Sequence, residues 1–192
     1  LYGLNPLILV YTMGEAHLEI IPLFFTILAY YLYLKKQWAW LYIAIGTAIM
    51  IKAPYIIFLP FFINRKNATF LPFICIPLYL MFAYVQTPLE LLQSITTFAT
   101  SHSYNGLFHT LVSFAVSKSI ASYIIFPIAA LLYTAVFFIT PMRSKALFNV
   151  AIIFLLCSPM FHPWCLIMVT PFLVLHPSRS VLLLHLSVIP LV

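Results

Sequence analysis

The sequence predicts an all-α fold: a polytopic transmembrane helical bundle with short re-entrant helices, forming a single transmembrane domain over residues 1–192. Hydrophobic residues fill 65% of the positions and charged residues 6%. The mean hydropathy of +1.12 is typical of integral membrane proteins. The apolar residues also come in runs of the roughly 20 residues that a helix needs to cross a bilayer, with short polar segments between them.

Basic residues set the order of the spans, because Lys and Arg in short loops favour the cytoplasmic side. The first span is predicted from about Leu18 to Leu34, ending at Lys35-Lys36. The next basic pair, Arg65-Lys66, reaches the same side if the residues between the two pairs enter the membrane and turn back. Proline disfavours helix at its own position and at the one before, so Lys52-Ala53-Pro54 offers the turn. A re-entrant hairpin is predicted here, with one kinked span as the alternative.

The remaining spans follow the same rule. Residues 69–85 cross outward, and residues 86–119 form an external segment whose stretch TPLELLQSITTF has the spacing of an interfacial helix. Residues 120–140 return, 146–160 cross outward and 165–175 come back. The chain carries a net charge of +6, but its basic residues are scattered in twos without a stripe, so the sequence indicates no nucleic-acid partner.

Two of the three carboxylates lie in one hexapeptide, Gly14-Glu15-Ala16-His17-Leu18-Glu19. A carboxylate at the centre of a membrane helix costs about 2.5–3.5 kcal/mol. Glu15, His17 and Glu19 are therefore expected in a hydrated vestibule at the outer end of the first span. There they would be catalytic or would orient substrate; metal binding and a merely interfacial position stay open as alternatives.

Four more residues are candidates for substrate binding. Lys52 lies at the predicted helix break, where an ammonium group suits a phosphate, although its side chain can also snorkel from a simple span. His162 and Trp164 belong to the turn SPMFHPWC, in which tryptophan is also a common interfacial anchor. Asn105 belongs to the polar patch SHSYNG of the external segment.

Together these motifs resemble membrane glycosyltransferases of the C-type fold (GT-C), in particular mannosyltransferase-like members. The resemblance covers nearly the whole chain. The family commonly carries aspartate where Glu19 stands, and tyrosine or another aromatic residue where Cys165 stands. The motifs that carry the resemblance are, in order, Asn5-Pro6, Gly14-x-x-His17-x-Glu19, Gly46 with Lys52-x-Pro54, Tyr104-Asn105-Gly106 and His162-Pro163-Trp164.

The resemblance implies a hexosyltransferase that moves a sugar, such as mannose, from a polyprenyl-phosphate donor to a lipid or glycan acceptor. The protein would be multi-pass in the cytoplasmic (inner) membrane, with its active site on the extracytoplasmic face. The family's main catalytic aspartate is expected upstream of Leu1, so these residues are expected to be a fragment that is inactive alone. No cofactor is implied with certainty, and a divalent metal stays open.

A transporter or lipid-carrier flippase is the alternative class. Ionisable residues beside broken membrane helices also line the pathways of substrates and protons. Transporters of this kind carry matched broken segments in both halves, and the sequence shows no convincing pair.

Overall fold

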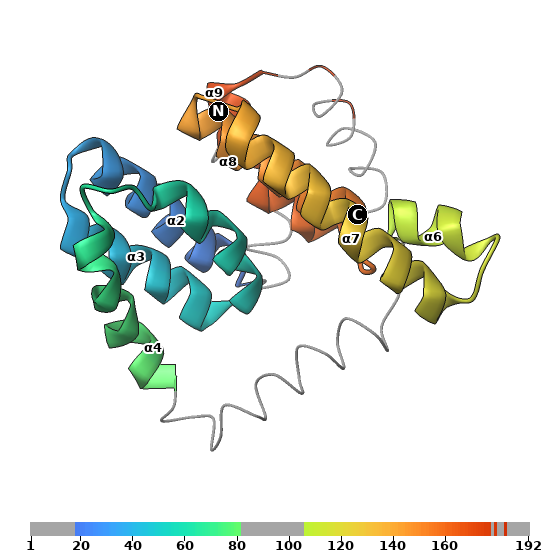
Figure 1. Cartoon of the computed structure of the whole chain (residues 1–192), viewed down its shortest axis with the longest axis horizontal. Helices are drawn as coiled ribbons and strands as arrows, with labels where there is room; N and C mark the ends of the chain where they lie inside the picture. Colours follow the sequence, from blue (N-terminus) through green and yellow to red (C-terminus); the bar gives the residue numbers. More distant parts are fainter. Residues whose placement is uncertain (1–17, 82–105, 178, 180–182, 184–192) are drawn as a thin grey trace. The chain divides into compact units, whose positions relative to one another are not determined.

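The computed structural model describes residues 18–81 and 106–177, together with 179 and 183 (Figure 1). The chain divides into two compact units. We call residues 18–92 the hairpin unit, described up to residue 81, and the other unit, described from residue 106, the C-terminal unit. The described residues form α-helices and 3-10 helices joined by turns, with no strand among them. This agrees with the predicted all-α class.

The hairpin unit begins with two antiparallel helices, α2 (Ile20–Leu34) and α3 (Trp38–Ile51). The turn between them is a Schellman motif. The Gln37 N–H donates to the Leu32 carbonyl over 3.0 Å, and the Lys36 N–H donates to the Tyr33 carbonyl over 3.1 Å. Lys36 has φ = 58°, in the left-handed region where glycine is usual. The tight turn folds α3 back along α2.

The predicted helix break lies at Lys52. This residue is extended, with φ = −149° and ψ = 104°, and η3 (Ala53–Phe62) follows it as a 3-10 helix. Tyr55, Phe58 and Phe61 recur every three residues, so a helix of three residues per turn brings them onto one face. All three are buried, and η3 packs back against both α3 and α2. The chain therefore turns back at Lys52, as the hairpin prediction requires.

Two short helices, η4 (Ala68–Ile74) and α4 (Cys75–Met81), complete the described part of this unit and pack on α3. Gly46 allows the close approach. A Cβ atom at this position would lie 2.7 Å from Cγ of Pro77 and 2.9 Å from the carbonyl oxygen of Ile74. The glycine of the Gly46–Lys52 motif thus has a packing role.

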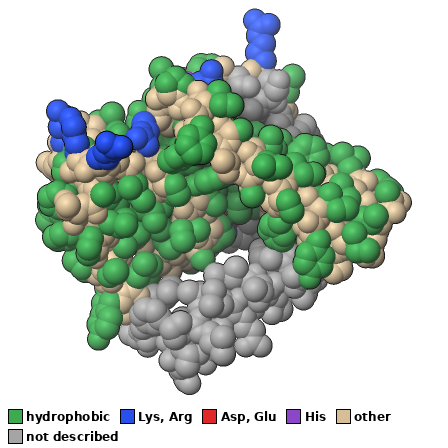
Figure 2. All heavy atoms as spheres, viewed as in Figure 1, with side chains coloured by type: hydrophobic (Ala, Val, Ile, Leu, Met, Phe, Trp, Pro, Cys, Tyr) green, Lys and Arg blue, Asp and Glu red, His purple; other side chains and the backbone are tan. Residues whose placement is uncertain are grey.

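The two basic turns of the hairpin unit lie at the same end. The turn with Arg65 and Lys66 is anchored by Asn67, which is fully buried and whose side-chain oxygen accepts a hydrogen bond from the Tyr42 hydroxyl over 2.9 Å. The Phe62 ring lies 6.1 Å from the Tyr33 ring, just before Lys35 and Lys36. Figure 2 shows basic side chains gathered over this end of the unit, and Lys52 lies at the other end of α3.

The C-terminal unit comprises five described helices. They are α6 (Leu107–Ser113), α7 (Lys118–Ile139), α8 (Arg143–Cys157), η5 (Pro163–Met168) and α9 (Thr170–Leu175). The end of α9 returns to the start of α8, because the His176 ring and the Ser144 hydroxyl are hydrogen-bonded over 2.8 Å. Arg143 therefore lies at the end of α8 where the chain leaves α9, and the turn before η5 follows the opposite end.

Helix α7 is long and apolar enough to cross a membrane by length and composition. Only 11% of its most apolar 18-residue window is buried within the protein, so its apolar surface faces outward. The other apolar helices in the described ranges are shorter, at 10–17 residues. A bundle with several spans stays a prediction.

We expect Gly46→Ala to lower the free energy of unfolding in detergent micelles by about 1–2 kcal/mol. Overpacking costs about 1–3 kcal/mol, and the better helix propensity of alanine returns up to about 1 kcal/mol. Thr47→Ala is the matched control. Its hydroxyl bonds only the Ile43 carbonyl of its own helix, so its loss should leave stability nearly unchanged. Equal stability of the two variants would contradict the close packing of α3 on η4 and α4.

Cysteines introduced at positions 36 and 65 should be labelled by an impermeant thiol reagent from the same side of the membrane. Both turns lie at one end of the hairpin unit, so no membrane can separate them. The measurement needs a background in which Cys75, Cys157 and Cys165 are replaced by serine. Labelling from opposite sides would rule out the hairpin as a re-entrant element.

Candidate functional site

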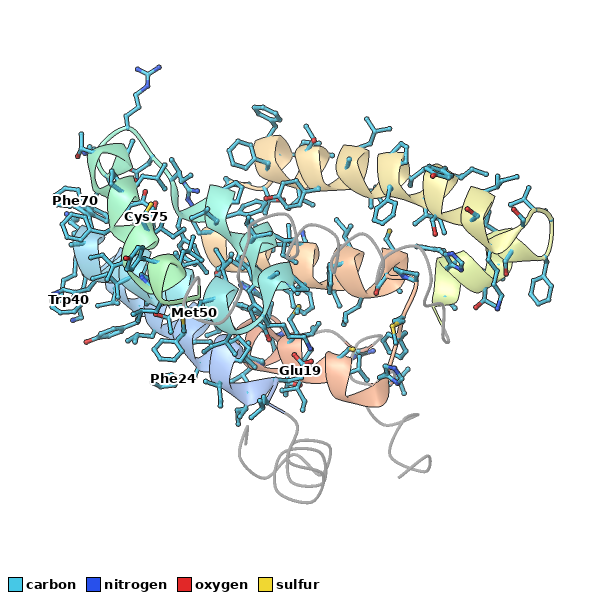
Figure 3. The ribbon with its side chains drawn as sticks, turned by 90° about the horizontal axis from the view of Figure 1, so that it is seen from below. Glu19, Phe24, Trp40, Met50, Phe70 and Cys75 are labelled. Atoms are coloured by element: carbon cyan, nitrogen blue, oxygen red, sulfur yellow. The ribbon has the colours of Figure 1, made fainter. Side chains whose placement is uncertain are left out.

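The candidate site lies where α2 begins and α3 ends. Glu19 directly precedes α2, and Lys52 directly follows α3. Because the two helices are antiparallel, these ends are adjacent, and Lys52 Nζ forms an ion pair with Glu19 Oε1. Figure 3 shows Glu19 at one end of this unit, with Trp40 and Phe70 at the other. Two residues predicted separately, 33 positions apart in sequence, thus come together.

Burial makes this pair asymmetric. Glu19 is 5% exposed, whereas 42% of the Lys52 side chain is exposed. The N-terminus of α2 favours the negative charge of Glu19, since the helix dipole is positive there. The carboxylate is thus enclosed, whereas part of the Lys52 side chain that it holds stays exposed. An ammonium group held in this way can bind an oxyanion such as a phosphate.

Tyr55 is a member of this site that the sequence reasoning missed. Its hydroxyl donates to the backbone carbonyl of Glu19 over 3.3 Å, and the residue is fully buried. The bond links the first turn of η3 to the start of α2. A signal existed, because Tyr55 directly follows Pro54 at the predicted break, where a buried hydroxyl needs a partner.

The other predicted site residues lie elsewhere. Glu15, His17 and Asn105 are outside the described residues. His162 directly precedes η5 in the C-terminal unit and is half-buried, and Trp164 lies within η5. The catalytic and substrate-binding roles expected of these residues stay predictions.

Two polar motifs meet within the C-terminal unit. Gly106, the last residue of the Tyr104–Gly106 motif, packs against the backbone of Ser158 and Pro159. A Cβ atom on Gly106 would lie 2.4 Å from the Ser158 carbonyl oxygen and 2.7 Å from that of Pro159. Only glycine fits at such an approach. The residue after Asn105 is therefore held against the turn that leads to His162.

A buried histidine next to this contact also escaped the sequence reasoning. His109 of α6 is 4% exposed, and its Nε2 lies 3.0 Å from the Ser122 hydroxyl of α7. Together with Cys157 and Pro159, the two side chains line a small hollow. The bond joins α6 to α7 beside the Gly106 contact. Its sequence signal is weak: a single histidine that follows Leu107 and Phe108 in the first turn LFHT.

The sequence left a divalent metal open. Within residues 18–81 and the described part of the C-terminal unit, no group of three or more His, Cys, Asp or Glu side chains could hold a metal ion.

The sequence is strongly apolar, and the described residues are helical, with one helix of spanning length and an ion pair at a helix break. These are features of a membrane protein with a polar site. Comparison with known families makes this more specific. Residues 1–65 match the family model described as alpha-(1->6)-mannopyranosyltransferase, N-terminal domain. This match supports a mannosyltransferase-like protein with glycosyltransferase function. No curated protein and no solved structure matches the chain.

We expect removal of Lys52 to destabilise the hairpin unit more than neutralisation of Glu19 does. Lys52→Met leaves a buried carboxylate without its cation, at a cost of about 2–3 kcal/mol. In Glu19→Gln the half-exposed Lys52 side chain remains hydrated, so the loss of stability should be smaller. The double variant Glu19→Gln/Lys52→Met should recover much of the loss. Unfolding in detergent gives the three values as a double-mutant cycle. Additive losses in the double variant would contradict a direct pair.

Proposed function

We propose that this chain belongs to the membrane domain of a GT-C-like mannosyltransferase that takes a hexose from a polyprenyl-phosphate donor. One observation carries the proposal: the ion pair of Glu19 and Lys52 lies at a helix break inside residues 1–65, the range that matches the mannosyltransferase family model. A charged pair at a broken helix of so apolar a chain is by default a functional site. The acceptor is a lipid or a glycan.

The reaction creates the charge that Lys52 would stabilise. The acceptor hydroxyl oxygen bonds to the anomeric carbon of the sugar, and the bond from that carbon to the phosphate oxygen breaks. The hydroxyl proton passes to a carboxylate, and polyprenyl phosphate leaves with one more negative charge. A fixed ammonium group lowers the barrier, because it stabilises this charge as it develops. A half-exposed lysine at the turn of the hairpin suits that task.

Glu19 acts in this scheme by holding Lys52 in place. Its carboxylate is buried and engaged by the ammonium group, so it is a positioning residue for the phosphate contact. Glu15 and His17 precede it in sequence and would orient the acceptor or the sugar. The resemblance implies a carboxylate as the proton acceptor. Asn105, His162 and Trp164 would contact the sugar or its carrier.

The site would face the extracytoplasmic side of the inner membrane. Within the hairpin unit, the exposed turns at Lys35-Lys36 and Arg65-Lys66 lie at the end away from Lys52. Basic loops favour the cytoplasmic side, so Lys52 and Glu19 would point away from it. A polyprenyl-phosphate donor in the outer leaflet would present its phosphate at this level.

In the full-length protein, Lys52→Ala should reduce sugar transfer about ten- to a hundredfold, because a hydrogen bond to a charged group contributes about 1.5–3 kcal/mol. Lys52→Arg should retain part of the activity, since the positive charge remains. Glu19→Gln should also impair transfer, because it keeps the shape and removes the charge that holds Lys52. The assay is transfer of radiolabelled mannose from mannosyl-phosphoryl-polyprenol in membranes, with protein levels matched.

Lys118→Ala is the control for this assay. It removes an exposed lysine of the C-terminal unit at the start of α7 and should transfer sugar at the wild-type rate. Wild-type rates in both Lys52→Ala and Glu19→Gln would remove the site assignment. A different outcome would favour the transporter class. In that outcome neither the wild type nor any variant transfers mannose from this donor, but the wild type binds or moves the lipid carrier.

A further inference from the structure

We propose that the four cations Lys35, Lys36, Arg65 and Lys66 form one binding surface for the phosphate of an anionic phospholipid. We call this set the basic end of the hairpin unit. All four side chains are exposed, and they come from two turns separated by 28 residues that the fold places side by side. The surface lies away from Glu19 and Lys52 and does not depend on sugar transfer.

Hydrogen bonds hold the backbone of both turns, so the positions from which the four side chains extend are fixed. The first is closed by the two backbone bonds to Leu32 and Tyr33. In the second, the Asn67 amide nitrogen donates to the Phe62 carbonyl over 2.9 Å, and its oxygen accepts from the Asn64 N–H over 2.8 Å. Binding of an anion therefore has to order the four side chains but not the two turns, which lowers its entropic cost.

The positive charge of the basic end is not balanced by any carboxylate among the described residues, so its counter-ion has to come from elsewhere. The described residues contain one carboxylate, Glu19, and it pairs with Lys52 at the other end of the unit. Between Glu19 and Glu90 the sequence contains no acidic residue at all. Clustered Lys and Arg beside a membrane segment attract anionic headgroups, with about 1 kcal/mol per cation near the surface.

Apolar side chains around the basic end identify the anion as a lipid. Tyr31 is 53% exposed, Leu34 59% and Trp40 63%, and all three lie in the helix turns next to Lys35-Lys36. Aromatic residues at headgroup level with cations above them are typical of a membrane interface. A free phosphate ion would neutralise the charges and leave these side chains in water, whereas a phospholipid would cover them with its acyl chains.

The test uses the full 192-residue chain purified in a neutral detergent. Phosphatidylglycerol, phosphatidylcholine, inorganic phosphate and heparin are titrated separately, and bound lipid is counted by native mass spectrometry. The thermal midpoint is measured in parallel. Phosphatidylglycerol should bind and raise the midpoint, and phosphatidylcholine and inorganic phosphate should do neither at the same concentration. Each cation contributes about fivefold in affinity at a membrane surface. Lys36→Gln/Arg65→Gln should therefore weaken phosphatidylglycerol binding on the order of tenfold or more.

Two further variants keep the result interpretable. Lys35→Gln/Lys66→Gln removes the same charge from the other two positions and should lose as much affinity, while circular dichroism should show the helices intact in both double variants. Lys118→Gln removes an exposed lysine outside the basic end and should bind as the wild type does. Unchanged affinity in both double variants, or equal binding of phosphatidylcholine, would overturn the proposal. So would tight binding of heparin, because a soluble polyanion would then be the better fit.

Discussion

The contact between Glu19 and Lys52 determines how the first three helices of the hairpin unit fit together. It joins the start of α2 to the end of α3, and Tyr55 joins η3 to the same point through the Glu19 carbonyl. Burying the Glu19 carboxylate without a cation beside it is costly, so the pair favours arrangements in which both helix ends meet. The hydrophobic packing of α2, α3 and η3 alone is less selective, because apolar faces can slide past one another.

Much of the hairpin unit could be predicted from its sequence. The break at Lys52 follows from Pro54, and the limits of α2 follow from the apolar run that ends at Lys35-Lys36. The 3-10 form of η3 was harder to predict, because it depends on which face of the helix packs against the core. That Tyr55, Phe58 and Phe61 are the buried positions is evident only once the core is known. The ion pair itself also escaped prediction. Both residues were singled out, but their meeting requires the antiparallel register of two helices.

The C-terminal unit shows a different limit. Its helix boundaries follow hydropathy closely, since α7 and α8 are long apolar runs. Its polar contacts do not. Gly106 packs against the backbone of Ser158, which is 52 positions away in sequence. His109 contacts Ser122 only because α6 packs on α7. Pairings of this kind depend on tertiary structure, and no local pattern encodes them. The basic end of the hairpin unit is a similar case, scattered in sequence and gathered by the fold.

The 3-10 geometry of η3 also sets the dimensions of the hairpin. At about 1.5 Å per residue, the 14 residues of α3 extend about 21 Å. At about 2.0 Å per residue, the 10 residues of η3 extend about 20 Å, where an α-helix of the same length would reach only about 15 Å. The shorter arm therefore returns to the level from which the longer arm started. Because a 3-10 helix rises further per residue, ten residues suffice to bring the chain back to the level at which α3 began.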